Sequence, residues 1–109
     1  MANVRLEFGW KYKCYELRAC PKHLARLSPD EPNETIDLVK WTEDGDGRSF
    51  CYSLAYFVRY SEGYYLRFVG DRPFQNIEKE DVPIVWSALH AAQTILDTFW
   101  ALQDEDGEC

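Results

Sequence analysis

The sequence predicts an α+β protein, in which an antiparallel β-sheet packs one of its faces against one long C-terminal α-helix. Apolar and polar residues alternate along several short segments of residues 3–69, and turn-forming residues separate these segments. Apolar residues then recur with a helical period over residues 81–103. We therefore expect one compact domain over residues 1–103, followed by a mobile acidic tail over residues 104–109.

The N-terminal third contains the first alternating segment. Residues 3–18 alternate between apolar and polar side chains, which indicates either one bent strand or the two strands of a tight hairpin. Residues 21–27 begin with Pro and continue with helix formers, which favours one or two helical turns. Residues 28–34 hold two prolines and several acids and amides, as is typical of a surface loop.

The middle of the chain predicts a three-stranded antiparallel meander. Residues 35–41, 49–60 and 64–69 have the composition and period of strands. The first two are joined by the turn sequence "TEDGDGR" at residues 42–48, in which two glycines supply positive φ angles. A short "SEG" turn joins the last two.

Strict alternation along residues 49–60 would give this strand two distinct faces. One face would carry Cys51, Ser53, Ala55, Phe57 and Arg59. The other would carry Phe50, Tyr52, Leu54, Tyr56, Val58 and Tyr60. Because small side chains leave room for a helix, we expect the helix to cover the first face.

The predicted helix begins with Asp81 at the N-cap and Pro83 in the first turn. Its apolar stripe consists of Val85, Leu89, Ala92, Ile95 or Leu96, Phe99 and Leu102. The alanines at positions 88, 91 and 92 would permit close approach to the sheet.

Composition excludes several functional classes. The chain is 46% apolar and 16% aromatic, which favours a packed globule over a disordered chain. A net charge of −7 argues against direct binding of a nucleic-acid backbone. There is no run of 18 apolar residues and no signal-peptide pattern, so we expect a cytoplasmic protein without a membrane partner.

Sequence motifs favour neither a metal site nor catalysis. His90 lacks a second ligand at helical spacing, and the Cys20–His23 pair has no second pair near it. The "EDGDG" segment lacks the closing glutamate of a calcium loop. Cys51 lies among aromatics in a strand and is expected to pack. We therefore expect no metal, no cofactor and no enzymatic activity, although an enzyme built from scattered residues stays an alternative.

The aromatic surplus is the most informative feature for function. Tyr52, Tyr56, Tyr60, Tyr64, Tyr65 and Trp41 all fall on the three meander strands, with Arg59 or Arg67 among them. If the helix covers one face of the sheet, the other face would display several of these side chains, as protein interfaces do. The alternative is that the N-terminal strands and residues 19–34 cover this face, which would make the tyrosines ordinary core.

The stretch "CYSLAYFVRYSEGYYLRFVGDRPF" resembles a segment of small proteins from phages and prophages of gut Firmicutes. The matching residues are Leu54, Ala55, Tyr56, Glu62, Gly63, Tyr64, Leu66, Phe68, Val69, Gly70, Asp71, Arg72, Pro73 and Phe74. The resemblance covers roughly a quarter of the chain and implies a mobile element in a host bacterial cell. By analogy, small acidic phage proteins with one domain include inhibitors of bacterial defence such as anti-CRISPR proteins.

The leading hypothesis is a non-enzymatic inhibitor that docks an acidic, tyrosine-rich face on the basic nucleic-acid channel of a defence nuclease. The partner would be a Cas nuclease or its complex, and the chain would act as a monomer or a homodimer. The predicted partner-binding residues are Glu43, Asp44, Asp46, Tyr52, Tyr56, Glu62, Tyr64 and Arg72. The alternatives are a binder of a nucleotide signal through Arg72, Arg67 and tyrosines, and a virion or structural protein.

The "GDRPF" segment links the last predicted strand to the helix. Gly70 and Pro73 are suited to the change of direction there. A turn does not require an arginine, so Arg72 either pairs with an acid such as Asp71 or Glu78 or binds a partner.

Overall fold

The computed structural model describes residues 8–20, 35–60 and 62–107. Its elements are β1 (Gly9–Tyr12), β2 (Tyr15–Cys20), β3 (Thr35–Glu43), β4 (Ser49–Tyr60), β5 (Gly63–Phe68), the short 3₁₀ helix η1 (Lys79–Asp81) and α2 (Val82–Gly107). The predicted helical turn at residues 21–27 and the loop at residues 28–34 lie outside the described residues, as does any strand before Gly9.

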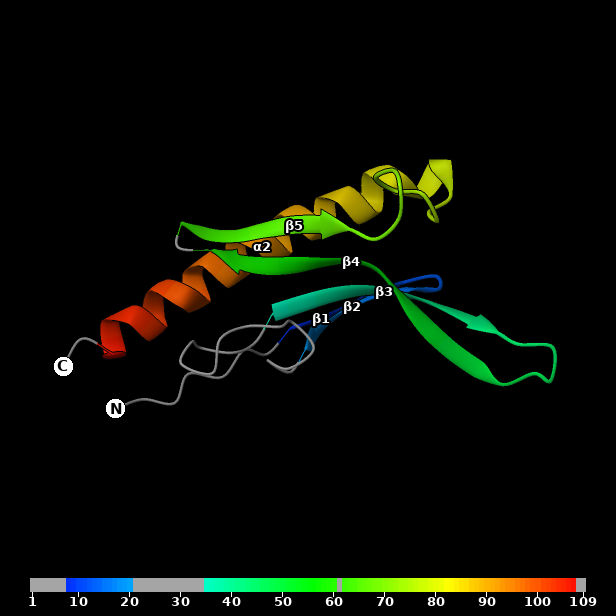
Figure 1. Ribbon diagram of the computed structural model, residues 1–109, viewed down its shortest axis with the longest axis horizontal. Helices are drawn as coiled ribbons and strands as arrows, with labels where there is room; N and C mark the ends of the chain where they lie inside the picture. Colours follow the sequence, from blue (N-terminus) through cyan, green and yellow to red (C-terminus); the bar gives the residue numbers. More distant parts are fainter. Residues whose placement is uncertain (1–7, 21–34, 61, 108–109) are drawn as a thin grey trace.

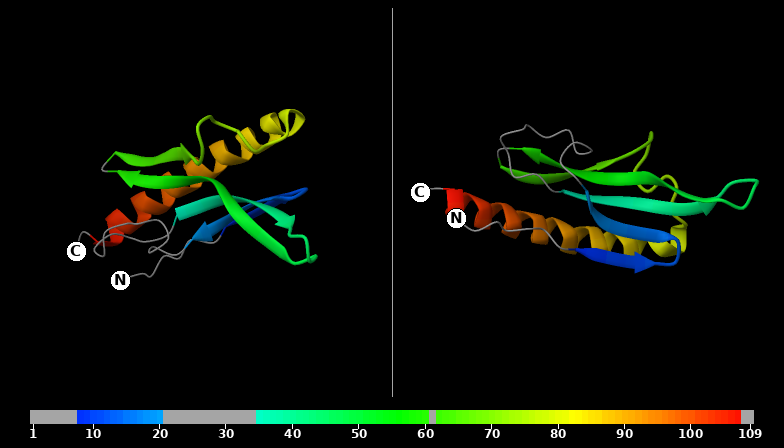
Figure 2. Two further views of the ribbon diagram at one scale, coloured as in Figure 1. Left: turned by 45° about the vertical axis from the view of Figure 1, so that its right-hand side comes forward. Right: turned by 90° about the horizontal axis from the view of Figure 1, so that it is seen from below.

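The five strands form one antiparallel sheet in the order β1-β2-β3-β4-β5, and α2 packs across one of its faces (Figures 1 and 2). We call this the helix face and the opposite one the far face. The architecture confirms the predicted α+β class and the antiparallel meander.

The N-terminal segment forms a hairpin rather than one bent strand. β1 and β2 pair from Gly9 with Arg18 to Tyr12 with Tyr15. Two residues make the turn, and the first of them, Lys13, has a φ of 53°. Positive φ angles in a two-residue turn match the twist of the flanking strands, which is why this turn closes a hairpin.

A β-bulge interrupts the pairing of β3 with β4. Leu38 is paired with Ala55, whereas the next residue, Val39, is paired with Ser53. Leu54 is therefore an extra residue in β4, and it is buried in the core. One extra residue exchanges the faces of all side chains that precede it in the strand.

The bulge overturns the predicted faces of β4 in part. Ala55 and Phe57 are buried on the helix face as predicted. Ser53 lies on the far face, where its hydroxyl donates to the carboxylate of Asp37 at 2.6 Å, and Cys51 shares that face. The prediction of one continuous small-residue face is therefore wrong, because strict alternation stops at Leu54.

The core lies between the helix face and α2. The helix contributes the predicted stripe, in which Val85, Ala88, Leu89, Ala92, Leu96 and Phe99 are buried. Of the two alternatives at the fourth position, Leu96 is fully buried, and Ile95 packs at the margin. Ala88 and Ala92 permit close approach as expected, whereas Ala91 is exposed.

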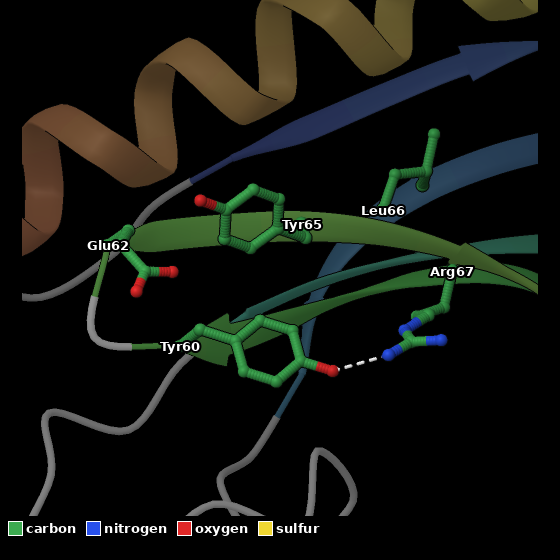
Figure 3. Close-up of a pocket in the computed structure, with 5 residues that line it drawn as sticks. All are labelled: Tyr60, Glu62, Tyr65, Leu66 and Arg67. Carbon is green, nitrogen blue, oxygen red and sulfur yellow. Dashed lines mark hydrogen bonds between the residues drawn. The ribbon is translucent and has the colours of Figure 1, made fainter.

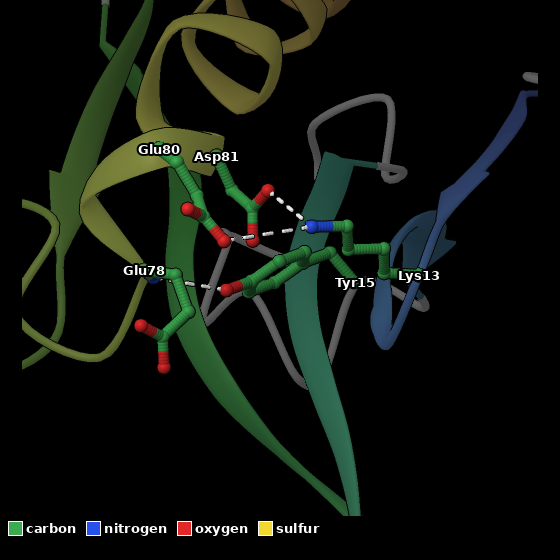
Figure 4. A network of polar contacts seen from close by, with 5 residues as sticks. All are labelled: Lys13, Tyr15, Glu78, Glu80 and Asp81. Atoms are coloured by element: carbon green, nitrogen blue, oxygen red, sulfur yellow. Dashed lines mark hydrogen bonds and ion pairs between the residues drawn. The ribbon is translucent and has the colours of Figure 1, made fainter.

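A polar cluster joins the first hairpin to the start of α2 (Figure 4). The ammonium of Lys13 donates to the carboxylate of Asp81 at 2.9 Å, and Asp81 is only 2% exposed. This hydrogen bond raises the pKa of Lys13. The buried hydroxyl of Tyr15 accepts from the backbone N–H of Glu78 at 3.0 Å, and burial raises its pKa. Asp81 immediately precedes α2, which is the position predicted for it, and its side chain binds Lys13 of the first hairpin.

The helix continues past its predicted end. It runs to Gly107, so residues 104–107 form its last turn instead of beginning a tail, and residues 108–109 lie outside the described part. Ala101, Leu102, Gln103 and Glu105 are good helix formers, and no Pro or Gly interrupts residues 84–106. Among the described residues, no helix is long and apolar enough to cross a membrane.

Candidate functional site

The most prominent surface feature is a two-stranded arm, which we define as residues 41–51. The pairing of β2 with β3 ends at Tyr15 and Lys40, and one more backbone bond links Trp41 to Cys14. Beyond this point β3 and β4 pair only with each other, and the arm extends away from the helix (Figure 1). The radius of gyration of 15.0 Å exceeds the value of about 13 Å that is typical of this chain length.

The arm and its base expose large aromatic side chains on both sides. Phe50 is 45% exposed, and Tyr52 is exposed beside it on the helix-face side. Trp41 is exposed on the other side, where its indole N–H donates to the carboxylate of Glu16 at 2.8 Å. A two-stranded ribbon has no second layer to bury such residues, so these side chains stay open to solvent.

Acidic residues cluster at the tip of the arm, but they have different roles. The carboxylate of Asp44 accepts hydrogen bonds from the backbone N–H groups of Asp46 and Arg48, at 2.8 and 2.9 Å. Asp44 therefore shapes the turn. The carboxylates of Glu43 and Asp46 are exposed and make no such bond within the described residues. These two are available to a partner.

The predicted acidic face is not continuous. Glu43, Asp44 and Asp46 precede β4, whereas Glu62 follows it at the opposite end. A strand of 12 residues separates them by roughly 40 Å at about 3.3 Å per residue. The expectation that these four acids form one docking surface is therefore wrong, because β4 is extended.

The predicted tyrosines also divide between environments. Tyr64 is only 1% exposed and packs edge-on against Trp100 of α2 at 6.1 Å, so its predicted exposed position is wrong. The reason is register: Tyr64 pairs with Arg59 on the helix face. Tyr56 lies half-buried on the far face, and Tyr52 lies at the base of the arm.

A second candidate surface is a shallow concavity on the far face near the turn between β4 and β5 (Figure 3). Its volume is about 480 Å³, and it is lined by Tyr60, Glu62, Tyr65, Leu66 and Arg67. The guanidinium of Arg67 donates to the hydroxyl of Tyr60, a contact that raises the pKa of Arg67. The rings of Tyr60 and Tyr65 lie 5.4 Å apart. Arg72 does not line this concavity.

Arg72 is exposed in the loop after β5 and forms no ion pair within the described residues. The predicted pairing with Asp71 or Glu78 is therefore wrong. The loop is organised instead by Gln75, whose side-chain oxygen accepts from the backbone N–H groups of Asp71 and Arg72. Sequence reasoning missed Gln75, because a glutamine in a loop carries no specific turn signal.

The potential metal ligands and the candidate thiol and imidazole lie apart in the described part of the chain. No group of three or more potential metal ligands occurs among them. Cys51 lies on the far face and accepts a hydrogen bond from Arg18 at 3.6 Å. His90 lies on α2, against the ring of Trp86 at 4.4 Å. The sheet therefore separates the thiol from the imidazole.

The chain was compared with known proteins at the level of family, sequence and structure. No family model, no curated protein and no solved structure matches it. The function proposed below is therefore inferred from the arm, the concavity and the charges of the chain.

Proposed function

We propose that this chain is a non-enzymatic binding protein that inhibits a bacterial defence nuclease, such as a Cas nuclease, by inserting its arm into a nucleic-acid-binding groove. The observation that carries the proposal is the arm itself. It exposes Trp41, Phe50 and Tyr52 at its base and sides and ends in acidic residues. Aromatic side chains of this kind dominate the binding energy of protein interfaces.

Charge supports a nucleic-acid-binding partner. The chain carries a net charge of −7, and Glu43 and Asp46 project from the tip of the arm. Carboxylates at such a tip would occupy positions that phosphates occupy in a basic groove, and their attraction would weaken as salt screens it. Inhibition would therefore be stoichiometric and competitive with DNA or RNA.

The proposal is tested by capturing partners from a nuclease-treated bacterial lysate on the immobilised chain and identifying them by mass spectrometry. Two arm variants are compared with the unmodified chain. The Phe50→Ser/Tyr52→Ser variant removes exposed aromatics, and the Glu43→Gln/Asp46→Asn variant removes two charges. Asp44 is left intact because it shapes the turn. Each variant should weaken binding at least tenfold, which corresponds to about 1.4 kcal/mol.

The matched control is Glu62→Gln/Asp71→Asn, which removes the same charge at exposed positions away from the arm. It should bind as the unmodified chain does. The captured protein must also bind nucleic acid, and added DNA must compete with the chain. If the arm variants bind normally, or if only a small molecule is retained by the purified chain, the proposal is wrong.

A second candidate function is the binding of a small ligand, such as a nucleotide signal, in the concavity. The observation that favours it is the contact of the Arg67 guanidinium with Tyr60, whose ring lies beside that of Tyr65. Arginine beside exposed aromatic rings suits a phosphate attached to a planar base. Calorimetry with a panel of nucleotides tests it, with Arg67→Ala as the variant and Arg48→Ala as the control. Absence of binding by the unmodified chain would exclude this function.

A further inference from the structure

The outer edge of β5 carries backbone groups that pair with none of the described strands. β5 ends the sheet, and none of the described strands pairs with its outer side. Native edges are commonly blocked by proline, by charged side chains or by a bulge; the sequence GYYLRF contains no proline and no bulge, and its only charged residue is Arg67. The strand is therefore suited to pairing with another chain.

Hydrogen bonding shows which backbone groups face outward. The N–H of Val69 donates to a carbonyl of β4 at 2.9 Å, so alternate residues of β5 bond inward. Tyr64, Leu66 and Phe68 then direct their N–H and C=O groups away from the sheet. The N–H of Tyr64 donates outward to the carboxylate of Asp97 at 3.3 Å, which agrees with this direction. No such bond covers the N–H groups of Leu66 and Phe68 within the described residues.

We propose that a second copy of this chain pairs with this edge, antiparallel, with Leu66 of both copies at the two-fold axis. The N–H and C=O groups of the two Leu66 residues then bond to each other. The N–H of each Phe68 donates to the carbonyl of Tyr64 in the other copy, and a carbonyl oxygen can accept two bonds. In this register the N–H of Tyr64, which donates to Asp97, is the one N–H group of the pairing that gains no bond to the second copy.

Side chains favour this register over its neighbours. It places Tyr65 opposite Arg67 of the second copy, twice by symmetry, on the far face. Arg67 already makes such a contact within one chain, where its guanidinium lies 5.9 Å from the ring of Tyr60. A shift of two residues one way would require the N–H of Tyr64, which Asp97 occupies. A shift the other way would oppose two arginines.

The helix is compatible with this pairing. A two-fold axis perpendicular to the sheet places α2 of both copies on the same side of a ten-stranded sheet. Figure 1 shows the N-terminal half of α2 extending obliquely beyond the outer edge of β5, so in this pairing it would lie below β5 of the second copy, antiparallel to the helix of that copy. The exposed side chains of Val69 and Trp86 would lie at this junction.

Hydrogen exchange measured residue by residue tests the proposal on the unmodified chain. The amides of Leu66 and Phe68 should gain protection as protein concentration rises, because they are bonded only in the dimer. The amides of Tyr65 and Arg67 bond inward to β4 and serve as internal controls that should not change. Sedimentation over the same concentrations should show a monomer–dimer equilibrium.

Two substitutions of one exposed residue, Tyr65, test the register. Tyr65→Lys places an ammonium opposite Arg67 of the second copy and should weaken dimerisation about tenfold. Tyr65→Glu places a carboxylate there and should strengthen it by a similar factor. Both remove the same side chain, which is 43% exposed, so each serves as the folding control of the other.

Some results would overturn the inference. A chain that sediments as a monomer at all concentrations up to about 200 μM contradicts it. If a dimer forms but the amide hydrogens of Leu66 and Phe68 exchange as fast as in the monomer, the dimer uses another surface and the inference is wrong. Equal effects of the lysine and glutamate variants would exclude this register. Binding by the arm is independent of these outcomes, because the arm is formed by the ends of β3 and β4 and does not include β5.

Discussion

The ammonium of Lys13 lies 2.9 Å from the carboxylate of Asp81, and this contact joins two segments that are 68 residues apart in sequence. Lys13 occupies the turn between β1 and β2, and Asp81 immediately precedes α2. The contact therefore fixes the first hairpin against the start of the helix. Because Asp81 is buried, loss of the ammonium would leave a carboxylate without its cation.

Lys13→Met should lower the free energy of unfolding, and the difference from the unmodified chain should depend on pH. The pKa of Lys13 is raised above 10.5 by its bond to Asp81, so its contribution is complete below that pH and disappears as the pH rises through the raised value. Urea unfolding between about pH 8 and pH 11.5 measures the difference. The difference in free energy of unfolding between Lys13→Met and the unmodified chain should become smaller above pH 10.5.

The control for this prediction is Lys11→Met, which removes an exposed ammonium that lies outside the Asp81 contact. It should have little effect at any pH. Tyr15 contributes the same pH dependence to the Lys13→Met variant and to the unmodified chain. Because its pKa is raised in the folded state, the unfolded state ionises first, and the free energy of unfolding falls above about pH 10 in both. A difference between Lys13→Met and the unmodified chain that stays constant to the highest pH would contradict the role of the ammonium.

Leu54→Ala should destabilise the protein by about 2–5 kcal/mol, because it opens a cavity where the bulge fills the core. Leu54 is buried next to Ala55, so both consecutive residues face the core at this point. Thermal and urea unfolding measure the loss. Phe50→Ala, at an exposed position of the same strand, should cost less than about 1 kcal/mol. Similar losses in the two variants would show that Leu54 has no special role.

Gly70→Ala should also destabilise the fold. Gly70 has a φ of 108°, and an added Cβ would lie 2.6 Å from the side-chain oxygen of Gln75. The expected cost is about 1–3 kcal/mol, and the loop ordered by Gln75 should exchange its amides faster. Gly45→Ala, where a Cβ would meet no atom within 4 Å, is the matched control. An equal stability of both variants would contradict the close approach.

Shortening the arm should leave the domain folded. The backbone bond from Asp44 to Arg48 has the same register as the pair of Thr42 with Phe50, which is therefore a hydrogen-bonded pair. Replacing residues 43–49 by Asn-Gly joins this pair through a two-residue turn. The melting temperature should change by only a few degrees, since the core is untouched. Loss of cooperative unfolding would instead make the arm part of the fold.

Most of the architecture could be predicted because strands and helices repeat with different periods. The alternating segments and the apolar stripe of α2 were sufficient for the meander and the helix. The bulge was not predictable, because no glycine marks Leu54 and "SLAY" reads as regular alternation. The error then propagated to the faces of Cys51 and Ser53, which depend on the count of residues.

The candidate site was predictable only in its local parts. The acids of the turn were correctly placed at an exposed tip, since aspartate and glycine favour turns. The local sequence did not show which acids would be neighbours. β4 runs from Ser49 to Tyr60, so Glu62 lies at the end of β4 opposite the turn that holds the other acids. The burial of Tyr64 depended on its register with Arg59. To predict either position one must know which residues pair across the strands, and local sequence does not specify this pairing.

The bulge at Leu54 has a consequence for how the arm can diversify. The arm lies beyond the bulge, and its length does not affect the pairs from Asp37 with Tyr56 onward. Insertions of two residues in each strand would extend its reach and keep every aromatic on its present side. A single residue inserted between Tyr52 and Ser53 would instead shift the pairing of the arm by one residue and turn Phe50 and Tyr52 onto the side of Trp41. Such an insertion would gather Trp41, Phe50 and Tyr52 on one side of the arm and leave the domain that carries the arm unchanged.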